Sequence, residues 1–159
     1  MVELKINEKS SKGDYNLTET GEEFDFVILL FQRDFYCTNC RNQIQDVEER
    51  YDEFVDLNTQ VVSVLPENLS RAKDWDEKYD LSYPVVADEN KNVSDSFDQP
   101  VRFGPLGNLH DLIGRMPLTI ILDCRGDSME VVYREAGSNP SDRPSVDDLL
   151  AVLKEERGD

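Results

Sequence analysis

Residues 24–41 read Phe-Asp-Phe-Val-Ile-Leu-Leu-Phe-Gln-Arg-Asp-Phe-Tyr-Cys-Thr-Asn-Cys-Arg, and this stretch decides the fold. The apolar run from Phe24 to Phe31 has the length and composition of a strand that is buried on both faces of a parallel sheet. Residues 38–57 then place apolar side chains at helical spacing with charged side chains between them, which predicts an amphipathic helix. Cys37 and Cys40 therefore lie at the junction of a central strand and a helix.

The rest of the chain alternates strand and helix patterns around this junction. The spacing of apolar residues predicts strands at 59–65, 117–122 and 129–133, and helices at 69–79, 93–97 and after Ser145. Residues 84–87 form a short apolar stretch. This order predicts an α/β three-layer sandwich with a mixed sheet. Residues 1–23 are polar and predict a peripheral lead-in with a short strand at 2–6, while the Gly- and Pro-rich residues 99–115 predict a long loop. We find no repeat or second domain and expect residues 1–159 to form a single domain.

The composition excludes several classes of partner. The chain has 159 residues, 34 acidic against 17 basic ones, and a formal net charge of -17. Nucleic acids and anionic membrane surfaces carry charge of the same sign and are not expected to bind. No run of about 20 apolar residues and no signal peptide is present, so we expect a cytosolic protein. The acids are spread along the whole chain, which resembles the surfaces of cytosolic proteins from salt-loving archaea, although an ordinary acidic protein remains an alternative.

The position of the two cysteines predicts redox chemistry. Unpaired N–H groups and the positive end of the helix dipole stabilise an anion at a helix start, so the pKa of Cys37 should be lowered and its thiolate should be the nucleophile. Cys40 lies about one turn further on, close enough to close a disulfide. Tyr36 precedes the motif, and the cations Arg33 and Arg41 flank it. These two arginines either support a thiolate or merely cover the surface.

Two other interpretations of the cysteines are an inert buried pair and half of a zinc site. Zinc needs four ligands, and only Cys124 and His110 remain, without the spacing of a ligand pair. We therefore expect no metal and no cofactor. Cys124 is interpreted as a small residue at the end of a strand, and His110 as a solvated side chain in the long loop.

The order of these motifs resembles the thioredoxin fold. The strand, the Cys-x-x-Cys helix and Arg115-Met-Pro-Leu-Thr-Ile-Ile-Leu-Asp123 before a hairpin carry the resemblance. Residues 61–88, ending in Tyr83-Pro-Val-Val-Ala-Asp88, are similar to the peroxiredoxin-like branch, which includes alkyl hydroperoxide reductase and thiol-specific antioxidant (AhpC/TSA) proteins. The resemblance implies an antioxidant oxidoreductase that reduces peroxides or protein disulfides and is reset by a thioredoxin-type or small-thiol reductant. It also implies a cis Met116–Pro117 bond against the dithiol.

The sequence departs from the peroxiredoxin pattern Pro-x-x-x-Thr-x-x-Cys. With Cys40 at the last position, Arg33 replaces the Pro and Cys37 replaces the Thr; with Cys37 there, Asp34 replaces the Thr. The hydroxyl that would orient a peroxide is therefore missing. A non-enzymatic alternative is a redox-inactive binding module that uses its acidic surface or residues 104–114 to hold a protein partner.

Overall fold

The computed structural model describes residues 5–99, 116–137 and 141–158, and its strands form one seven-stranded sheet in the order β2-β1-β5-β4-β3-β6-β7. The strands are β1 (Asn7–Ser10), β2 (Gly13–Asn16), β3 (Phe26–Phe31), β4 (Thr59–Leu65), β5 (Val85–Ala87), β6 (Leu118–Asp123) and β7 (Glu130–Ala136). β3 pairs parallel with β4 and antiparallel with β6. The predicted mixed sheet with a central strand in residues 24–31 is therefore confirmed.

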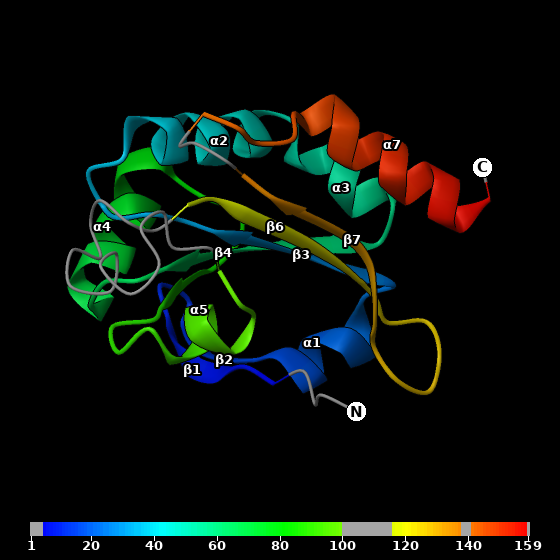
Figure 1. The fold of residues 1–159 in the computed structure, drawn as a ribbon, viewed down its shortest axis with the longest axis horizontal. Helices are drawn as coiled ribbons and strands as arrows, with labels where there is room; N and C mark the ends of the chain where they lie inside the picture. Colours follow the sequence, from blue (N-terminus) through cyan, green and yellow to red (C-terminus); the bar gives the residue numbers. More distant parts are fainter. Residues whose placement is uncertain (1–4, 100–115, 138–140, 159) are drawn as a thin grey trace.

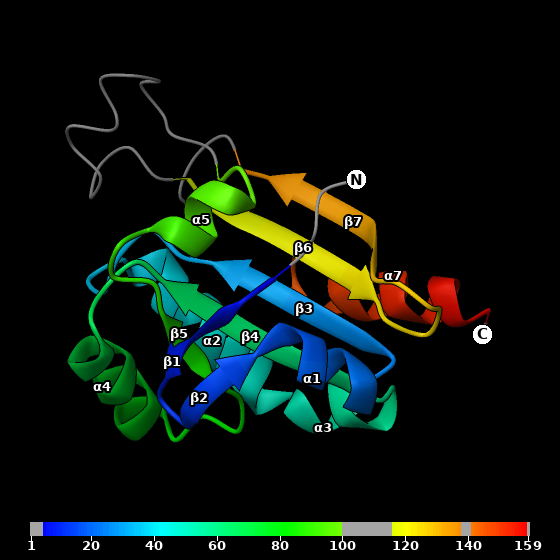
Figure 2. The same ribbon diagram turned by 90° about the horizontal axis from the view of Figure 1, so that it is seen from below.

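Helices cover both faces of the sheet, as Figures 1 and 2 show. They are α1 (Leu17–Glu23), α2 (Thr38–Glu49), α3 (Tyr51–Asp56), α4 (Leu69–Tyr79), α5 (Asn92–Ser96) and α7 (Val146–Arg157). Side chains of α2, α3, α4 and α7 pack with one face of β3 and β4, and side chains of α1 and α5 pack with the other. The alternating side chains of β3 divide between these two cores, since all six of its residues are buried. The three-layer arrangement is confirmed.

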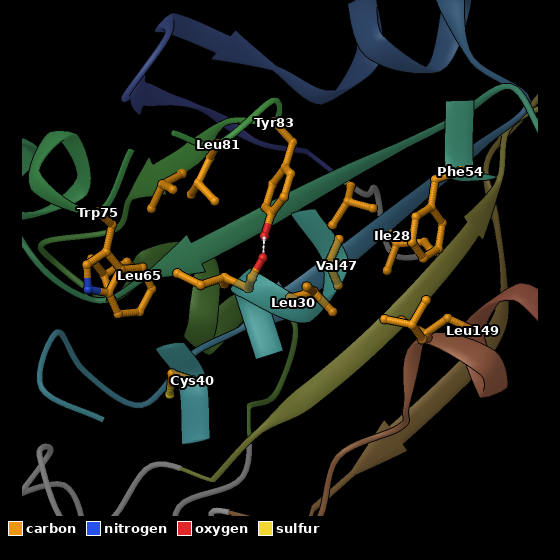
Figure 3. Close-up of a cluster of buried hydrophobic side chains, with 14 of the residues drawn as sticks. Ile28, Leu30, Cys40, Val47, Phe54, Leu65, Trp75, Leu81, Tyr83 and Leu149 are labelled. Carbon is orange, nitrogen blue, oxygen red and sulfur yellow. Dashed lines mark hydrogen bonds between the residues drawn. The ribbon is translucent and has the colours of Figure 1, made fainter. Parts of the chain in front are cut away.

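The core on the α2 side reaches the two cysteines. Figure 3 shows Tyr83, Val47 and Phe54 in this core, with Cys40 at the start of α2. The hydroxyl of Tyr83 donates a hydrogen bond to the backbone carbonyl of Ile44 at 2.7 Å, so this buried ring keeps a polar partner. Burying one aliphatic or aromatic side chain contributes about 1.5–3 kcal/mol to the stability of the fold. The start of α2 is therefore held in place by its packing against this core.

The chain start contributes more structure than its polar composition indicates. β1 and β2 form a hairpin, and β1 continues the sheet by pairing with β5. Tyr15 in β2 and Leu17 at the start of α1 are buried in the core that the sheet forms with α1 and α5. β1 lies at residues 7–10, and residues 2–4 of the strand predicted at 2–6 lie outside the described residues. The hairpin was not predicted, because a hairpin on a sheet edge buries only alternate residues and leaves little apolar signal.

The predicted helix 38–57 is interrupted in the structure. Arg50 has φ -117° and ψ 24° and separates α2 from α3. No Gly or Pro marks the break; instead the Arg50 side chain reaches Glu53 and, across the fold, Asp147 in α7. A tertiary contact thus accompanies a change of direction that periodicity does not reveal. None of the helices in the described part of the chain is long and apolar enough to cross a membrane.

Candidate active site

β3 and α2 position the two sulfur atoms. β3 ends at Phe31, a five-residue connection follows, and Cys37 is the N-cap of α2. The Cys37 sulfur accepts a hydrogen bond from the backbone N–H of Cys40 at 3.1 Å, so it occupies the place that a Ser or Asp oxygen usually takes at a helix start. The Cα atoms of the two cysteines lie 5.2 Å apart and the residues form a disulfide. The two cysteines that the sequence places at a helix start are therefore joined in the structure, and their catalytic role stays a prediction.

A half-buried arginine from the C-terminal part of the chain contacts the sulfurs. Nη2 of Arg143 lies 3.0 Å from Sγ of Cys40 and 3.8 Å from Sγ of Cys37. The backbone N–H of Arg33 also points at Sγ of Cys40, at 3.4 Å. Of the two sulfurs, Cys40 therefore has the closer guanidinium group. Both cysteines are buried, with exposed fractions of 1% and 0%, so a reagent must displace surrounding side chains to reach them.

Two glutamines hold this guanidinium group in place. Nη1 of Arg143 donates to Oε1 of Gln32 and to Oε1 of Gln43, each at 2.7 Å. Nε2 of Gln32 donates in turn to Gln43 and to Ser63 on β4. Because Arg143 binds the carbonyl oxygens of both amides, their orientation is determined. The result is a polar network beneath the disulfide that orients one cation toward it.

Burial shapes the electrostatics of this cation. Burial, with a smaller contribution from the charge of Arg33, lowers the pKa of Arg143 from its ordinary value to about 10. Arg143 still stays protonated at neutral pH. A cation within 4 Å of a thiol favours the thiolate and lowers its pKa by about 1–3 units, and the helix N–H groups act in the same direction. Reduction of the disulfide would therefore leave at least one thiol ready to ionise.

The predicted supporting residues lie close to the motif but have other partners. The Arg33 side chain pairs with the buried carboxylate of Asp34 at 2.8 Å, so only its backbone faces Cys40. Nε of Arg41 donates to the carbonyl of Phe35 at 2.9 Å. Tyr36 is 65% exposed. Neither predicted arginine side chain contacts a sulfur, because each already has a partner on the connection between β3 and α2.

The prediction of a cis Met116–Pro117 bond is wrong, because the described residues, which include both, contain no cis peptide bond. Their backbone carbonyls accept hydrogen bonds from the Gln99 side chain and from the N–H of Gly137. Pro117 directly precedes β6, a position where its missing N–H costs no sheet hydrogen bond. His110 and the 104–114 loop lie outside the described residues.

A pocket of about 210 Å³, lined by both polar and apolar side chains, lies between α2 and the start of α7. Asn39, Asn42, Gln43, Ser145 and Arg143 are among the residues that line it. A small polar molecule in this pocket would meet the guanidinium group that contacts the sulfurs. Within residues 5–99, 116–137 and 141–158, no three His, Cys, Asp or Glu side chains are grouped so as to hold a metal ion.

Sequence reasoning missed Arg143 and the two glutamines that hold it. Arg143 lies 103 residues after Cys40, in a stretch of Gly, Ser, Pro, Asn and Asp that reads as a loop. The local signal is a cation two residues before Ser145, the N-cap of α7. Nothing in that signal says which face of the sheet the loop reaches.

A family model described as "AhpC/TSA family" matches residues 2–126. The chain belongs to this family. Among curated relatives, the chloroplastic 2-Cys peroxiredoxin BAS1 of Spinacia oleracea is 33% identical over 136 residues, which are 81% of this chain and 47% of the relative. The putative peroxiredoxin YkuU of Bacillus subtilis is 30% identical over 89 residues, which are 52% of this chain and 49% of the relative. The chain spans about half the length of these relatives.

Solved structures support the same fold. The peroxidoxin BcpB of Mycobacterium tuberculosis superposes with a TM-score of 0.78 at 18% identity, covering 98% of this chain and 95% of that one. A mutant of the peroxiredoxin 6 of Arenicola marina gives 0.79 at 11% identity, covering 99% and 72%. The predicted thioredoxin-like, peroxiredoxin-like fold is confirmed. The thiol-bearing helix start is thus part of an architecture that peroxiredoxins share.

Proposed function

We propose that this AhpC/TSA-family chain is a thiol-dependent peroxidase that cycles between a Cys37–Cys40 dithiol and the disulfide. The observation that carries the proposal is the guanidinium group of Arg143 held 3.0 Å from Sγ of Cys40. A peroxide is cleaved by a thiolate, and a fixed cation both stabilises that thiolate and attracts the developing oxyanion. An inert pair or a redox-inactive binding module would not need a cation held against its sulfurs, so both alternatives are disfavoured.

The contacts favour Cys40 over Cys37 as the first nucleophile. The helix start alone favours Cys37, whose sulfur has the Cys40 N–H at 3.1 Å and Arg143 at 3.8 Å. Sγ of Cys40 has the Arg33 N–H at 3.4 Å and the guanidinium group of Arg143 at 3.0 Å. Charge-assisted hydrogen bonds are about twice as strong as neutral ones, so the closer guanidinium decides in favour of Cys40.

In the proposed cycle the Cys40 thiolate attacks one peroxide oxygen and the O–O bond breaks. Cys40 becomes a sulfenic acid, and the other oxygen leaves as water or an alcohol after taking up a proton. The Cys37 sulfur then attacks the sulfenic sulfur, which forms the disulfide and releases water. The guanidinium group of Arg143 and the N–H of Arg33, both directed at Sγ of Cys40, are the groups that can donate hydrogen bonds to the peroxide there. An external thiol reductant returns two electrons.

Assays with two substrates test this proposal. With dithiothreitol as reductant, the protein should consume hydrogen peroxide over many turnovers and should reduce insulin disulfides more slowly. Peroxide is small and needs only a slight displacement of side chains to reach the sulfurs, whereas insulin needs an extended docking edge. Absence of peroxide turnover together with rapid insulin reduction would replace the peroxidase by a disulfide reductase. A cytosolic location, expected from the sequence, stays a prediction.

A further inference from the structure

Phe35, Tyr36, Arg41 and Arg71 form a surface beside the dithiol, here named the arginine–aromatic platform. Phe35 and Tyr36 belong to the connection that leads directly into Cys37, and Arg71 lies in the first turn of α4. The Arg71 guanidinium lies 4.5 Å from the ring centroid of Phe35 and 5.0 Å from that of Tyr36. The Arg41 guanidinium lies 4.9 Å from the Phe35 centroid. Two cations and one exposed ring are thus grouped next to the redox pair.

The platform is rigid. The Phe35 carbonyl accepts hydrogen bonds from Nε of Arg41 and from Nε1 of the buried Trp75, at 2.9 and 3.2 Å. Phe35 also stacks on Trp75 with ring centroids 6.1 Å apart. The N–H groups of Phe35 and Tyr36 donate to the carboxylates of Glu67 and Asp34. A surface that is ordered before binding loses little entropy when a partner docks.

The charges of the platform are unusual for this protein. The chain carries a net charge of -17, and Arg33, Arg50, Arg125 and Arg157 each form an ion pair with a carboxylate. Within the described part of the chain, neither Arg41 nor Arg71 has a carboxylate at ion-pair distance. The carboxylates of Asp34 and Glu67 accept hydrogen bonds from backbone N–H groups of the platform. Two cations are therefore available to an acidic partner on a surface that otherwise repels one.

We propose that the arginine–aromatic platform docks the reductant and that this reductant is an acidic protein dithiol. This inference rests on the proposed function, since it supplies the partner that resets the Cys37–Cys40 pair. Tyr and Arg are enriched where protein interfaces concentrate binding energy, and Tyr36 is 65% exposed. A small thiol would gain little from so wide a surface, whereas an acidic protein gains both the ring and the two cations.

Docking there presents the partner to the chain segment that contains Cys37. A partner thiolate attacks Sγ of Cys37, the Cys37–Cys40 bond breaks, and Cys40 leaves as a thiolate beside Arg143. The second partner thiolate then attacks the mixed disulfide and releases the Cys37 thiolate. Two electrons pass to this protein, and the partner becomes a disulfide. Because a thiol of low pKa leaves faster, the cation at Cys40 favours attack at Cys37.

The test measures how fast a reduced thioredoxin of strongly negative net charge reduces the disulfide of this protein, followed by alkylation and mass spectrometry. Arg71→Glu should lower the second-order rate constant about tenfold at low salt, and added salt should shrink the difference. Lys73→Glu is the matched control, because Lys73 is an exposed cation two residues further along α4 and should change the rate less than twofold. Reduction by dithiothreitol should be the same in all three proteins.

Equal slowing by Arg71→Glu and Lys73→Glu would overturn the docking surface, as would a wild-type rate with this thioredoxin no faster than with dithiothreitol. Slowing of the dithiothreitol reaction by Arg71→Glu would overturn it too, since the effect would then lie in the dithiol. Arg71→Gln serves if the charge reversal fails to fold. Failure of the proposed peroxidase function is seen separately, as absence of peroxide turnover by wild-type protein with dithiothreitol.

Discussion

Cys124 and the Cys37–Cys40 pair lie at opposite ends of β3 and have opposite surroundings. Cys37 follows the end of β3, whereas the Cys124 N–H donates to the carbonyl of Asp25, just before β3 begins. Burial raises the pKa of Cys124 to about 11, and the carboxylates of Asp123 and Asp25 add to that shift. The pair has a helix N-terminus and a guanidinium group instead. Cys37 and Cys40 are buried and Cys124 is half-buried, so all three are partly or fully shielded from solvent. We therefore expect the sign of the neighbouring charge to distinguish a reactive sulfur from an inert one.

The largest expected effect comes from removing the sulfurs one at a time. Cys40→Ser should abolish the reaction with hydrogen peroxide. Cys37→Ser should lose turnover but still react once, leaving a sulfenic acid on Cys40 that dimedone labelling and mass spectrometry detect. Cys124→Ser is the matched control and should keep full activity. If Cys40→Ser retains the single reaction and Cys37→Ser loses it, Cys37 is the first nucleophile.

Removing the cation should have the next largest effect. Arg143→Met should raise the pKa of Cys40 by about 1–2 units, so the thiolate fraction at pH 7 and the rate of peroxide reduction should both fall roughly tenfold or more. Stopped-flow measurement across pH 5–9 gives both quantities. Arg125→Met removes a cation that pairs with Asp123 near Cys124, and it should leave the peroxide rate unchanged. An Arg143→Met protein with an unshifted pH profile would show that the guanidinium does not stabilise the thiolate.

Graded-pH alkylation compares the two ends of β3 directly. A free thiol ionises near pH 8.5, whereas a thiol with a pKa of about 11 is only about one-thousandth ionised at pH 8. In the reduced protein, iodoacetamide should therefore label one cysteine of the pair below pH 8.5 and Cys124 only as the pH approaches 11. Peptide mass spectrometry locates the label. Labelling of Cys124 first would contradict the inference that carboxylates raise the pKa of Cys124 and that Arg143 lowers the pKa of the pair.

The smallest effects concern the helix caps near each end. Ser145 caps α7 by accepting from the Asp148 N–H at 3.1 Å, and Asn16 caps α1 by accepting from the Glu19 N–H at 3.0 Å. Ser145→Ala and Asn16→Ala should each lower the free energy of unfolding by about 1 kcal/mol. Ser145 is two residues from Arg143, so its variant should also slow peroxide reduction, by less than Arg143→Met.

Asn16→Ala is the control for Ser145→Ala, because α1 lies next to Cys124, at Gly21, and not next to the dithiol. Urea unfolding gives the stability, and the peroxide assay gives the rate. Equal slowing by both variants would mean that general loss of stability, and not the position of Arg143, limits the reaction.

Much of the fold could be predicted because its signals are local. The apolar run of β3, the helical spacing of α2 and the β-branched composition of β4 each depend on neighbours in the chain. Periodicity does not predict the helix break at residue 50, because the Arg50 side chain reaches Asp147, which is far away in sequence. A cis Met116–Pro117 peptide bond is expected from the family resemblance alone, and the structure has a trans bond there.

The candidate site divides in the same way. The dithiol and its place at a helix start are visible in residues 24–41, because a strand, a short connection and a helix follow one another there. Arg33 and Arg41 are expected at the sulfurs for their closeness in sequence. In the structure the Arg33 side chain pairs with Asp34, and the Arg41 side chain donates to the carbonyl of Phe35. Arg143 contacts the sulfurs instead.

The sequence by itself determined which sulfurs can pair, since a spacing of three on a helix places them one turn apart whatever surrounds them. Only the tertiary structure decided which charge those sulfurs meet. That charge comes from a loop 103 residues away and is oriented by Gln32 and Gln43, and such long-range contacts depend on how the layers pack. The order of residues determines which side chains lie one helical turn apart, whereas the packing of the whole fold determines which atoms surround a buried sulfur.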